Sequence, residues 1–186
     1  ITSAVEDYLN QLADARCSIK DQQELSEAYK KIINERWVNG STLINELSYI
    51  PTKAEILAEF KNAIEDYEPT GYFTDYNLNI TDISIKKYGT NGAIANLEYE
   101  VACEFYGTPL EMDSWGLTTA DNENYDNYGT CNTDPSILYH QNRTYESEDY
   151  YLKLIDGEWK IYAVSGYYYM SDTKQIDEVE GGAENE

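Results

Sequence analysis

The chain has 186 residues, with 35 acidic side chains against 13 basic ones and a formal net charge of −22. This length suits a single domain with a sizeable core, and no apolar run approaches the ~18 residues that span a bilayer. A surface this negative repels phosphate backbones and anionic lipid heads, so we expect no nucleic-acid partner and no direct membrane insertion.

Three helices are expected between about residues 3 and 67. Each opens with a capping box, at Ser3–Glu6, Asp21–Glu24 and Thr52–Glu55. Apolar residues then recur at helical spacing, as in Val5, Tyr8, Leu9, Leu12 and Ala13 of the first helix and Ile56, Leu57, Phe60, Ile64 and Tyr67 of the third. Because each apolar stripe lies on one side, we expect the helices to pack on an apolar surface.

After Gly71 the pattern changes to alternation, which predicts a sheet over about residues 72–169. The clearest strand runs from Ala93 to Phe105, where every odd-numbered residue is apolar and most even-numbered ones are Asn or Glu. One face of this strand is therefore expected to be buried, and the other acidic and exposed.

The alternation is lost after Gly107, and we expect a long acidic loop over residues 107–140. Its run of Asp and Asn resembles a calcium loop in composition, with Asp121 and Asp126 as the candidate ligands. It lacks the glycine and the closing glutamate of an EF-hand, so we expect no metal site. His140, the single histidine, is expected to be an exposed loop residue.

The turn Asp156-Gly157 predicts a β-hairpin, because a type I′ turn needs positive φ at both central positions. The pairs that this turn places on one face are Leu154/Trp159, Leu152/Ile161, Tyr150/Ala163, Glu148/Ser165, Glu146/Tyr167 and Thr144/Tyr169. The other face carries Ile155/Glu158, Lys153/Lys160 and Tyr151/Tyr162. The first face is more apolar near the turn, so we expect it to face the core.

The far end of this core-facing row is the candidate ligand-binding site, made of Glu146, Glu148, Tyr150, Tyr167 and Tyr169. Two carboxylates on one strand face suit acid/base chemistry, because their mutual repulsion raises one pKa. They equally suit a bound cation or amine. Glu146 and Glu148 are the catalytic candidates, and solvated charge at the edge of the sheet is the alternative.

The cysteines Cys17, Cys103 and Cys131 show no CxxC spacing, so neither a zinc site nor a redox motif is expected. One disulfide and a free thiol would suit an oxidising compartment, with Cys103 and Cys131 as the first pair to test, whereas three thiols would suit a cytosol. No cofactor is expected. Residues 1–176 are predicted to form one domain, and residues 177–186 an acidic disordered tail.

The expected order of elements in this chain is helices, a short strand, long hairpin strands, a variable loop and the final hairpin YYLKLIDGEWKIYAV. This order resembles the nuclear-transport-factor-2-like (cystatin-like α+β) superfamily. Residues 145–164, with their D-G turn and E-W-K-I, resemble the last two strands of its small secreted or lipoprotein bacterial members. The resemblance implies an α+β fold, in which N-terminal amphipathic helices pack on a curved antiparallel sheet that forms a cone with a pocket.

The resemblance leaves function open, because the superfamily includes isomerases, dehydratases, transport factors and domains without known catalysis. The leading hypothesis is a non-catalytic extracytoplasmic domain, secreted or lipid-anchored at the bacterial cell surface, that binds a small ligand or a protein partner. A start at Ile1, without a leader, fits a mature product. One alternative is an isomerase-, dehydratase- or hydrolase-type enzyme that uses a pocket carboxylate. The other is a homodimer through a sheet face bearing Tyr151, Tyr162 and Tyr168.

Overall fold

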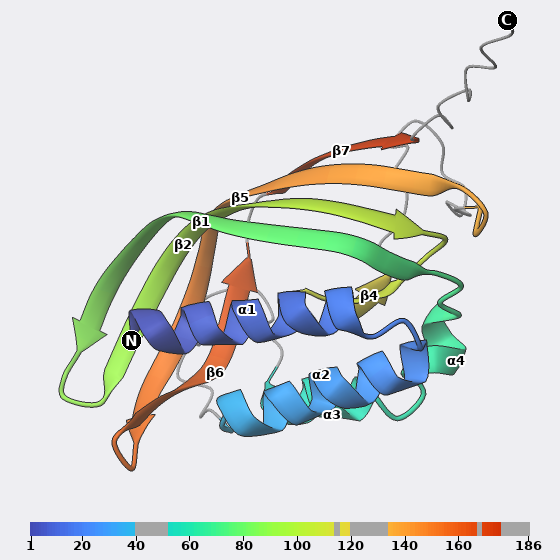
Figure 1. Cartoon of the computed structure of the whole chain (residues 1–186). Helices are drawn as coiled ribbons and strands as arrows, with labels where there is room; N and C mark the ends of the chain where they lie inside the picture. Colours follow the sequence, from blue (N-terminus) through green and yellow to red (C-terminus); the bar gives the residue numbers. More distant parts are fainter. Residues whose placement is uncertain (40–51, 114–115, 120–133, 167–168, 176–186) are drawn as a thin grey trace, which may run out of the picture.

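The computed structural model describes residues 1–39, 52–113, 116–119, 134–166 and 169–175 (Figure 1). Within these ranges, helices precede strands along the chain. The elements are α1 (Thr2–Ser18), α2 (Gln22–Arg36), α3 (Lys53–Glu59), α4 (Ala63–Tyr67), β1 (Tyr72–Tyr88), β2 (Gly92–Tyr106), β3 (Leu110–Asp113), β4 (Gly116–Thr119), β5 (Leu138–Ile155), β6 (Glu158–Gly166) and β7 (Tyr169–Gln175).

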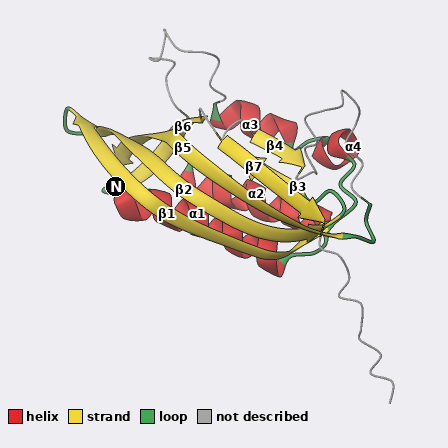
Figure 2. Cartoon of the chain, turned by 90° about the horizontal axis from the view of Figure 1, so that it is seen from above, coloured by secondary structure: helices red, strands yellow, loops and turns green. Residues whose placement is uncertain are grey.

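The fold is α+β, with α1 and α2 packed against one face of a curved antiparallel sheet (Figures 1 and 2). The strand order is β1-β2-β5-β6, and β7 pairs with the part of β5 that β6 leaves uncovered. Among the described strands β1 pairs only with β2, so the sheet is open. The expected fold class is confirmed.

The core lies between the helix stripes and the concave face of the sheet. Val5 of α1, Ile33 of α2 and Phe105 of β2 are all fully buried and belong to one apolar cluster. In β2 every odd-numbered residue from Ala93 to Phe105 is buried and the even-numbered ones are more exposed, which confirms the predicted alternation.

The helix starts are only partly as predicted. The side chain of Asp21 caps α2 by accepting from Glu24 N, and Thr52 with Glu55 forms a complete capping box on α3. The predicted box at Ser3 is wrong, because α1 begins at Thr2 and no side chain caps it.

The predicted third helix is interrupted before it reaches Tyr67. In the turn after α3, Lys61 N donates to Ala58 O over 3.3 Å, three residues back, and α4 restarts the helix at Ala63. This tighter hydrogen bond breaks the α-helical pattern. The helical turn expected at residues 43–47 lies outside the described residues.

Part of the predicted loop 107–140 is a small β-hairpin of β3 and β4. The buried Leu110 anchors it to α2, since its N donates to Gln22 Oε1 at 2.6 Å and its carbonyl accepts from Tyr29 Oη at 3.1 Å. Strands of four residues are too short to produce a recognisable alternation, which explains the error. His140 is also misplaced in the prediction, because it lies in β5 rather than in a loop.

The register of the last hairpin is confirmed near its turn and wrong beyond it. Asp156 and Gly157 have φ of 51° and 86°, and the four pairs from Ile155/Glu158 to Leu152/Ile161 are those predicted. A β-bulge at Tyr162 then shifts the register by one residue. The observed pairs are Tyr151/Ala163, Tyr150/Val164, Asp149/Ser165 and Glu148/Gly166, and further along Thr144/Met170 and Tyr145/Tyr169.

A second bulge, in β5, decides which side chains face the helices. Leu97 pairs with Glu148 and Tyr99 with Tyr145, so Glu146 and Ser147 together lie opposite the single residue Glu98. Before this bulge the odd-numbered residues of β5 are turned inward, and after it the even-numbered ones are.

Candidate functional site

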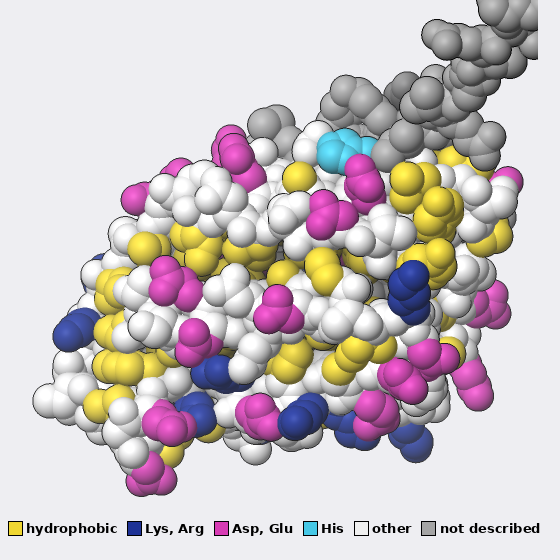
Figure 3. All heavy atoms as spheres, in the orientation of Figure 1, with side chains coloured by type: hydrophobic (Ala, Val, Ile, Leu, Met, Phe, Trp, Pro, Cys, Tyr) yellow, Lys and Arg dark blue, Asp and Glu magenta, His cyan; other side chains and the backbone are white. Residues whose placement is uncertain are grey.

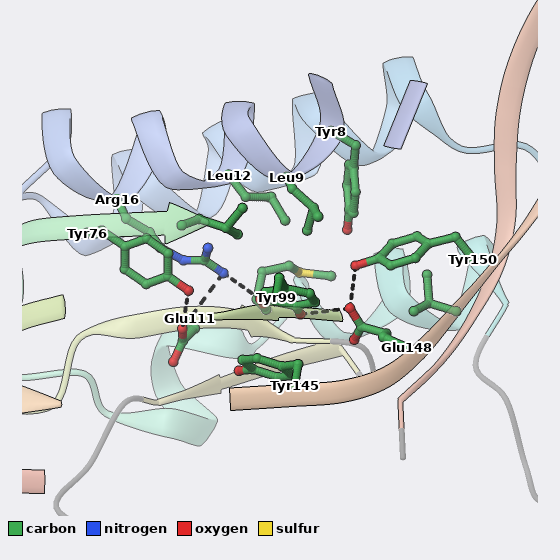
Figure 4. A pocket seen from close by; sticks show the side chains of 13 residues that line it. Tyr8, Leu9, Leu12, Arg16, Tyr76, Tyr99, Glu111, Tyr145, Glu148 and Tyr150 are labelled. Carbon is green, nitrogen blue, oxygen red and sulfur yellow. Dashed lines mark hydrogen bonds and ion pairs between the residues drawn. The ribbon is translucent and has the colours of Figure 1, made fainter. Parts of the chain in front are cut away.

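A small pocket lies between α1 and the concave face of the sheet (Figure 4). Its volume of about 30 Å³ is room for about two water molecules. Its apolar lining is Leu9, Leu12, Leu78, Met112 and Val164, and its polar lining is Tyr8, Arg16, Tyr76, Tyr99, Glu111, Tyr145, Glu148 and Tyr150. Arg16 and Glu111 lie at one end of the pocket and Glu148 at the other (Figure 4).

The first end, which we call the arginine end, is made of Arg16, Tyr76, Glu111 and Arg143. Arg16 comes from the last turn of α1 and shares the apolar stripe of that helix, so its side chain is carried into the interior and is 3 % exposed. Its Nη2 donates to Met112 O at 2.5 Å, and its guanidinium lies over the Tyr76 ring, 4.4 Å from the centroid.

Glu111 of β3 is the carboxylate of the arginine end. Its Oε1 accepts from Arg143 Nη1 at 2.6 Å and from Tyr76 Oη at 3.2 Å, while Arg16 Nη2 is 3.9 Å away. The side chains of all three charged residues are at most 8 % exposed. Two buried guanidinium groups therefore share one buried carboxylate.

The charge of Glu111 is stabilised by these neighbours. Burial raises the pKa of its carboxyl group, but the positive charges of Arg143 and Arg16 and the hydrogen bonds from Arg143 and Tyr76 outweigh burial, so the pKa is lowered. Glu111 is consequently ionised at neutral pH, and the arginine end carries an excess of positive charge.

The second end, which we call the carboxylate end, is made of Glu148, Tyr99 and Tyr150. Glu148 is 2 % exposed, and its Oε2 accepts from Tyr99 Oη at 2.7 Å and from Tyr150 Oη at 2.6 Å. These short separations are typical of hydroxyl groups that donate to an ionised carboxylate. The Tyr145 ring stacks on Tyr99 at 4.3 Å between centroids and supports the cluster from the side.

Both hydroxyl groups that hold Glu148 remain protonated donors. Burial raises the pKa of Tyr99 and that of Tyr150 well above the ordinary value, and the neighbouring charge of Glu148 raises them further. The carboxylate end is thus a buried carboxyl group that accepts from two neutral hydroxyl donors.

The structure brings two of the five predicted ligand-binding residues together. Glu148 and Tyr150 line the pocket. Glu146 is exposed instead, because the bulge in β5 turns it away and Tyr145 takes its place. The backbone of Tyr169 pairs with Tyr145 in β7, and Tyr167 lies outside the described residues.

The structure offers little for nucleophilic or metal chemistry in its described part. Burial raises the pKa of Cys103 to about 12, which keeps it a thiol, and its Sγ is 4.0 Å from Gln141 Oε1. His140 Nδ1 lies 3.7 Å from Glu104 Oε1, away from the pocket. No group of three or more metal-ligating side chains occurs among the described residues. Asp121, Asp126 and Cys131 lie outside them, so the predicted Cys103–Cys131 disulfide remains a prediction.

Sequence reasoning missed the arginine end entirely. Arg16 follows Leu9 and Leu12 at spacings of seven and four, so a charged residue on an apolar stripe was the available signal. Glu111 gave no signal, since it lies in one of the short strands. The side chain of Arg143 faces inward because of the bulge downstream of it, and no pattern in the neighbouring sequence predicts that bulge.

Comparisons with known proteins add little beyond this geometry. No protein-family model matches the chain, and no curated protein does. One similar solved structure is described as a "putative aromatic ring hydroxylase" from Novosphingobium aromaticivorans, with 12 % sequence identity, 93 % of this chain and 91 % of that chain covered, and a TM-score of 0.40. A likeness this distant identifies neither a family nor a reaction. None of the described helices is long and apolar enough to cross a membrane.

Proposed function

We propose that this chain is a non-catalytic domain that binds a small polar ligand in the pocket between α1 and the sheet. The observation that carries the proposal is that one small pocket is lined by a buried basic and a buried acidic side chain, Arg16 and Glu148. Isolated buried charges are costly unless they are paired or hydrogen-bonded. Their placement around one pocket is therefore better explained by recognition of a ligand than by stability alone.

The size of the pocket limits what it holds. At about 30 Å³ it accepts a polar group of a few heavy atoms, and a longer ligand needs the lining to move. The apolar contacts on offer come from Leu9, Leu12 and Val164. A small molecule with one polar head group and a short apolar part fits this lining.

An enzyme that uses Glu148 as a general base is the second candidate. It is favoured by one observation, the burial of this carboxylate in a pocket. Against it, Oε2 of Glu148 already accepts from the hydroxyl groups of Tyr99 and Tyr150, and these contacts compete with proton transfer from a substrate. The non-catalytic interpretation is therefore the better supported of the two.

The proposal keeps the nuclear-transport-factor-2-like superfamily and an extracytoplasmic location as its context. A helix-lined concave sheet supports the first, and the strongly acidic, tyrosine-rich composition is compatible with the second. A homodimer through the outer sheet face also stays a prediction. Its Tyr151 is only 6 % exposed, Tyr162 lies beside it at 6.1 Å between ring centroids, and Tyr168 is outside the described residues.

The binding proposal is tested by amide chemical shifts of ¹⁵N-labelled protein. Three probes of similar size are titrated separately: propionate, propylammonium and propan-1-ol. We expect at least one of them to shift amides of α1 and of β5 near Glu148. The response should change in Glu148→Gln and persist in Glu146→Gln, the same substitution on the exposed side of the same strand. If no probe perturbs the pocket amides, the proposed function is wrong.

The enzyme alternative is tested by hydrogen exchange next to a carbonyl group. Acetone, a small ketone, is incubated with the protein in D₂O, and deuterium incorporation is followed by NMR. We expect no rate above that of buffer. Catalysed exchange that is lost in Glu148→Gln and kept in Glu146→Gln would overturn the non-catalytic interpretation.

A further inference from the structure

We infer that the arginine end of the pocket is a carboxylate-binding site, and that Arg16 holds the single carboxylate group of this domain's ligand. The inference rests on the proposed function, since it names the chemistry of the ligand for the same pocket. The inference also distinguishes this pocket from a cation-binding site, which the net charge of −22 would favour.

The first argument is the balance of charge at the arginine end. Arg16 and Arg143 each form an ion pair with Glu111, so the two guanidinium groups share this carboxylate. Arg143 holds it closely, at 2.6 Å, and Arg16 only at 3.9 Å. The positive charge of a buried guanidinium is not fully compensated when its carboxylate partner is distant. A ligand anion bound beside the guanidinium supplies the missing negative charge.

The second argument is an unused donor on the same side chain. Among the described residues, two buried side-chain nitrogen or oxygen atoms have no hydrogen-bond partner, Arg16 Nε and Trp37 Nε1. Only Arg16 lines the pocket, and Figure 4 shows its guanidinium reaching from α1 into it. A buried donor without an acceptor destabilises the structure, and more so when it is charged. A ligand oxygen that accepts from Nε–H removes this cost.

The third argument is shape. Nε and Nη2 lie on one edge of the planar guanidinium, which matches the two oxygens of a carboxylate, and Nη2 carries a second N–H besides the one that it gives to Met112 O. The space of about 30 Å³ has room for the two oxygens of a carboxylate, and Leu12 and Met112 beside it suit the carbon that carries the group. A spherical ion such as chloride uses neither the planar edge nor the apolar lining.

The carboxylate end limits the ligand to one negative charge. Glu148 lines the same pocket, and its carboxylate oxygen Oε2 accepts from Tyr99 and Tyr150. A second carboxylate that extended from the arginine end toward Glu148 would meet a like charge. Monocarboxylates are therefore favoured over dicarboxylates of the same length.

The test compares probes by amide chemical shifts in HEPES buffer that contains no carboxylate and little chloride. We expect propionate to shift amides of α1, β3 and β5 with saturation, and propylammonium, propan-1-ol, succinate and chloride to bind at least tenfold more weakly. Equal binding of chloride would overturn the assignment to a carboxylate. Binding of propylammonium without propionate would overturn it too, while leaving the pocket a binding site. No response to any probe would remove both the inference and the proposed function.

Variants locate the site on Arg16. In Arg16→Lys the charge remains but the planar edge is lost, and we expect propionate to bind about tenfold more weakly. In Glu148→Gln, which leaves Arg16 and its partners in place, loss of the repelling charge should strengthen propionate binding several-fold. Glu146→Gln is the matched control and should not change it. Unchanged affinity in both Arg16→Lys and Glu148→Gln would overturn the inference, and the second variant keeps the test decisive if the first does not fold.

Discussion

The two ends of the pocket hold buried charge in different ways. At the arginine end, Glu111 is held by opposite charges, chiefly by Arg143 at 2.6 Å. At the carboxylate end, Glu148 is held by the neutral hydroxyl groups of Tyr99 and Tyr150. Removing one member of an ion pair leaves an uncompensated charge, whereas removing a charge from neutral donors leaves only dipoles to rearrange. The two ends should therefore respond very differently to the same substitution.

The surface of the protein provides a third environment for comparison. On the face shown in Figure 3, acidic and basic side chains are interspersed and no single broad patch of one sign covers the view. The described surface pairs include Lys31 with Glu35 at 4.0 Å, both more than half exposed. Pairs of this kind contribute little to stability because water and salt screen them.

The largest effect is expected from Glu111→Gln. The substitution leaves Arg16 and Arg143 buried without their shared counter-charge, so the free energy of unfolding should fall by about 3 kcal/mol or more. Urea unfolding followed by circular dichroism measures it. Glu100→Gln, an exposed position on β2, is the control and should stay within about 0.5 kcal/mol. A similar loss in both variants would show that the arginine end does not stabilise the fold.

The same residue gives a pH dependence with a defined sign. The pKa of Glu111 is lower in the folded protein than in the unfolded chain. Its contribution to the free energy of unfolding is therefore complete above the unfolded-state pKa of about 4.3, and it is lost as pH falls through the folded-state pKa. The difference in unfolding free energy between the natural protein and Glu111→Gln should thus narrow below about pH 4.3. A difference that stays constant down to the acid transition would contradict this account.

A smaller effect is expected from Tyr99→Phe. It removes a hydroxyl donor to the Glu148 carboxylate and keeps the ring, so we expect a loss of about 1–2 kcal/mol in urea unfolding. Tyr72→Phe, in which the hydroxyl lies outside the pocket, should be close to neutral. An equal loss of unfolding free energy in Tyr99→Phe and Tyr72→Phe would mean that the hydroxyl group bound to Glu148 stabilises the fold no more than one outside the pocket.

The smallest effects compare Glu148→Gln with Glu146→Gln. In the first variant the amide oxygen of the new side chain still accepts from tyrosine hydroxyl groups, so we expect a loss of no more than about 1 kcal/mol. Glu146 is exposed, and its substitution should stay within about 0.5 kcal/mol. Thermal unfolding of the two variants side by side checks this ranking, and a larger loss in Glu146→Gln would contradict the placement of the two faces.

The sequence predicted the features that depend on local pattern. Alternation defined β2, and the Asp156-Gly157 turn fixed the register as far as Leu152/Ile161. The bulges at Tyr162 and at Glu146–Ser147 could not be deduced, because an extra residue in a strand is specified by packing of the whole sheet rather than by neighbouring residues.

The candidate site was predicted only in part for the same reason. Glu148 and Tyr150 lie beyond the bulge on the side of the turn, where the predicted alternation still holds, and both reach the pocket. Glu146 lies within the bulge and does not. The arginine end gathers residues from α1, β1, β3 and β5, a combination that appears only once the chain is folded.

The bulge at Glu146–Ser147 also bears on how β5 can change during evolution. Loss of either codon would restore simple alternation, because Tyr145 and Glu148 would then lie two positions apart and both would face the helices. Arg143 and Tyr145 would keep their inward side chains, and Asn142 and Thr144 would stay on the outer face. A single in-frame deletion would thus regularise the strand in one step, with the polar lining of the pocket and the backbone hydrogen bonds of the sheet preserved.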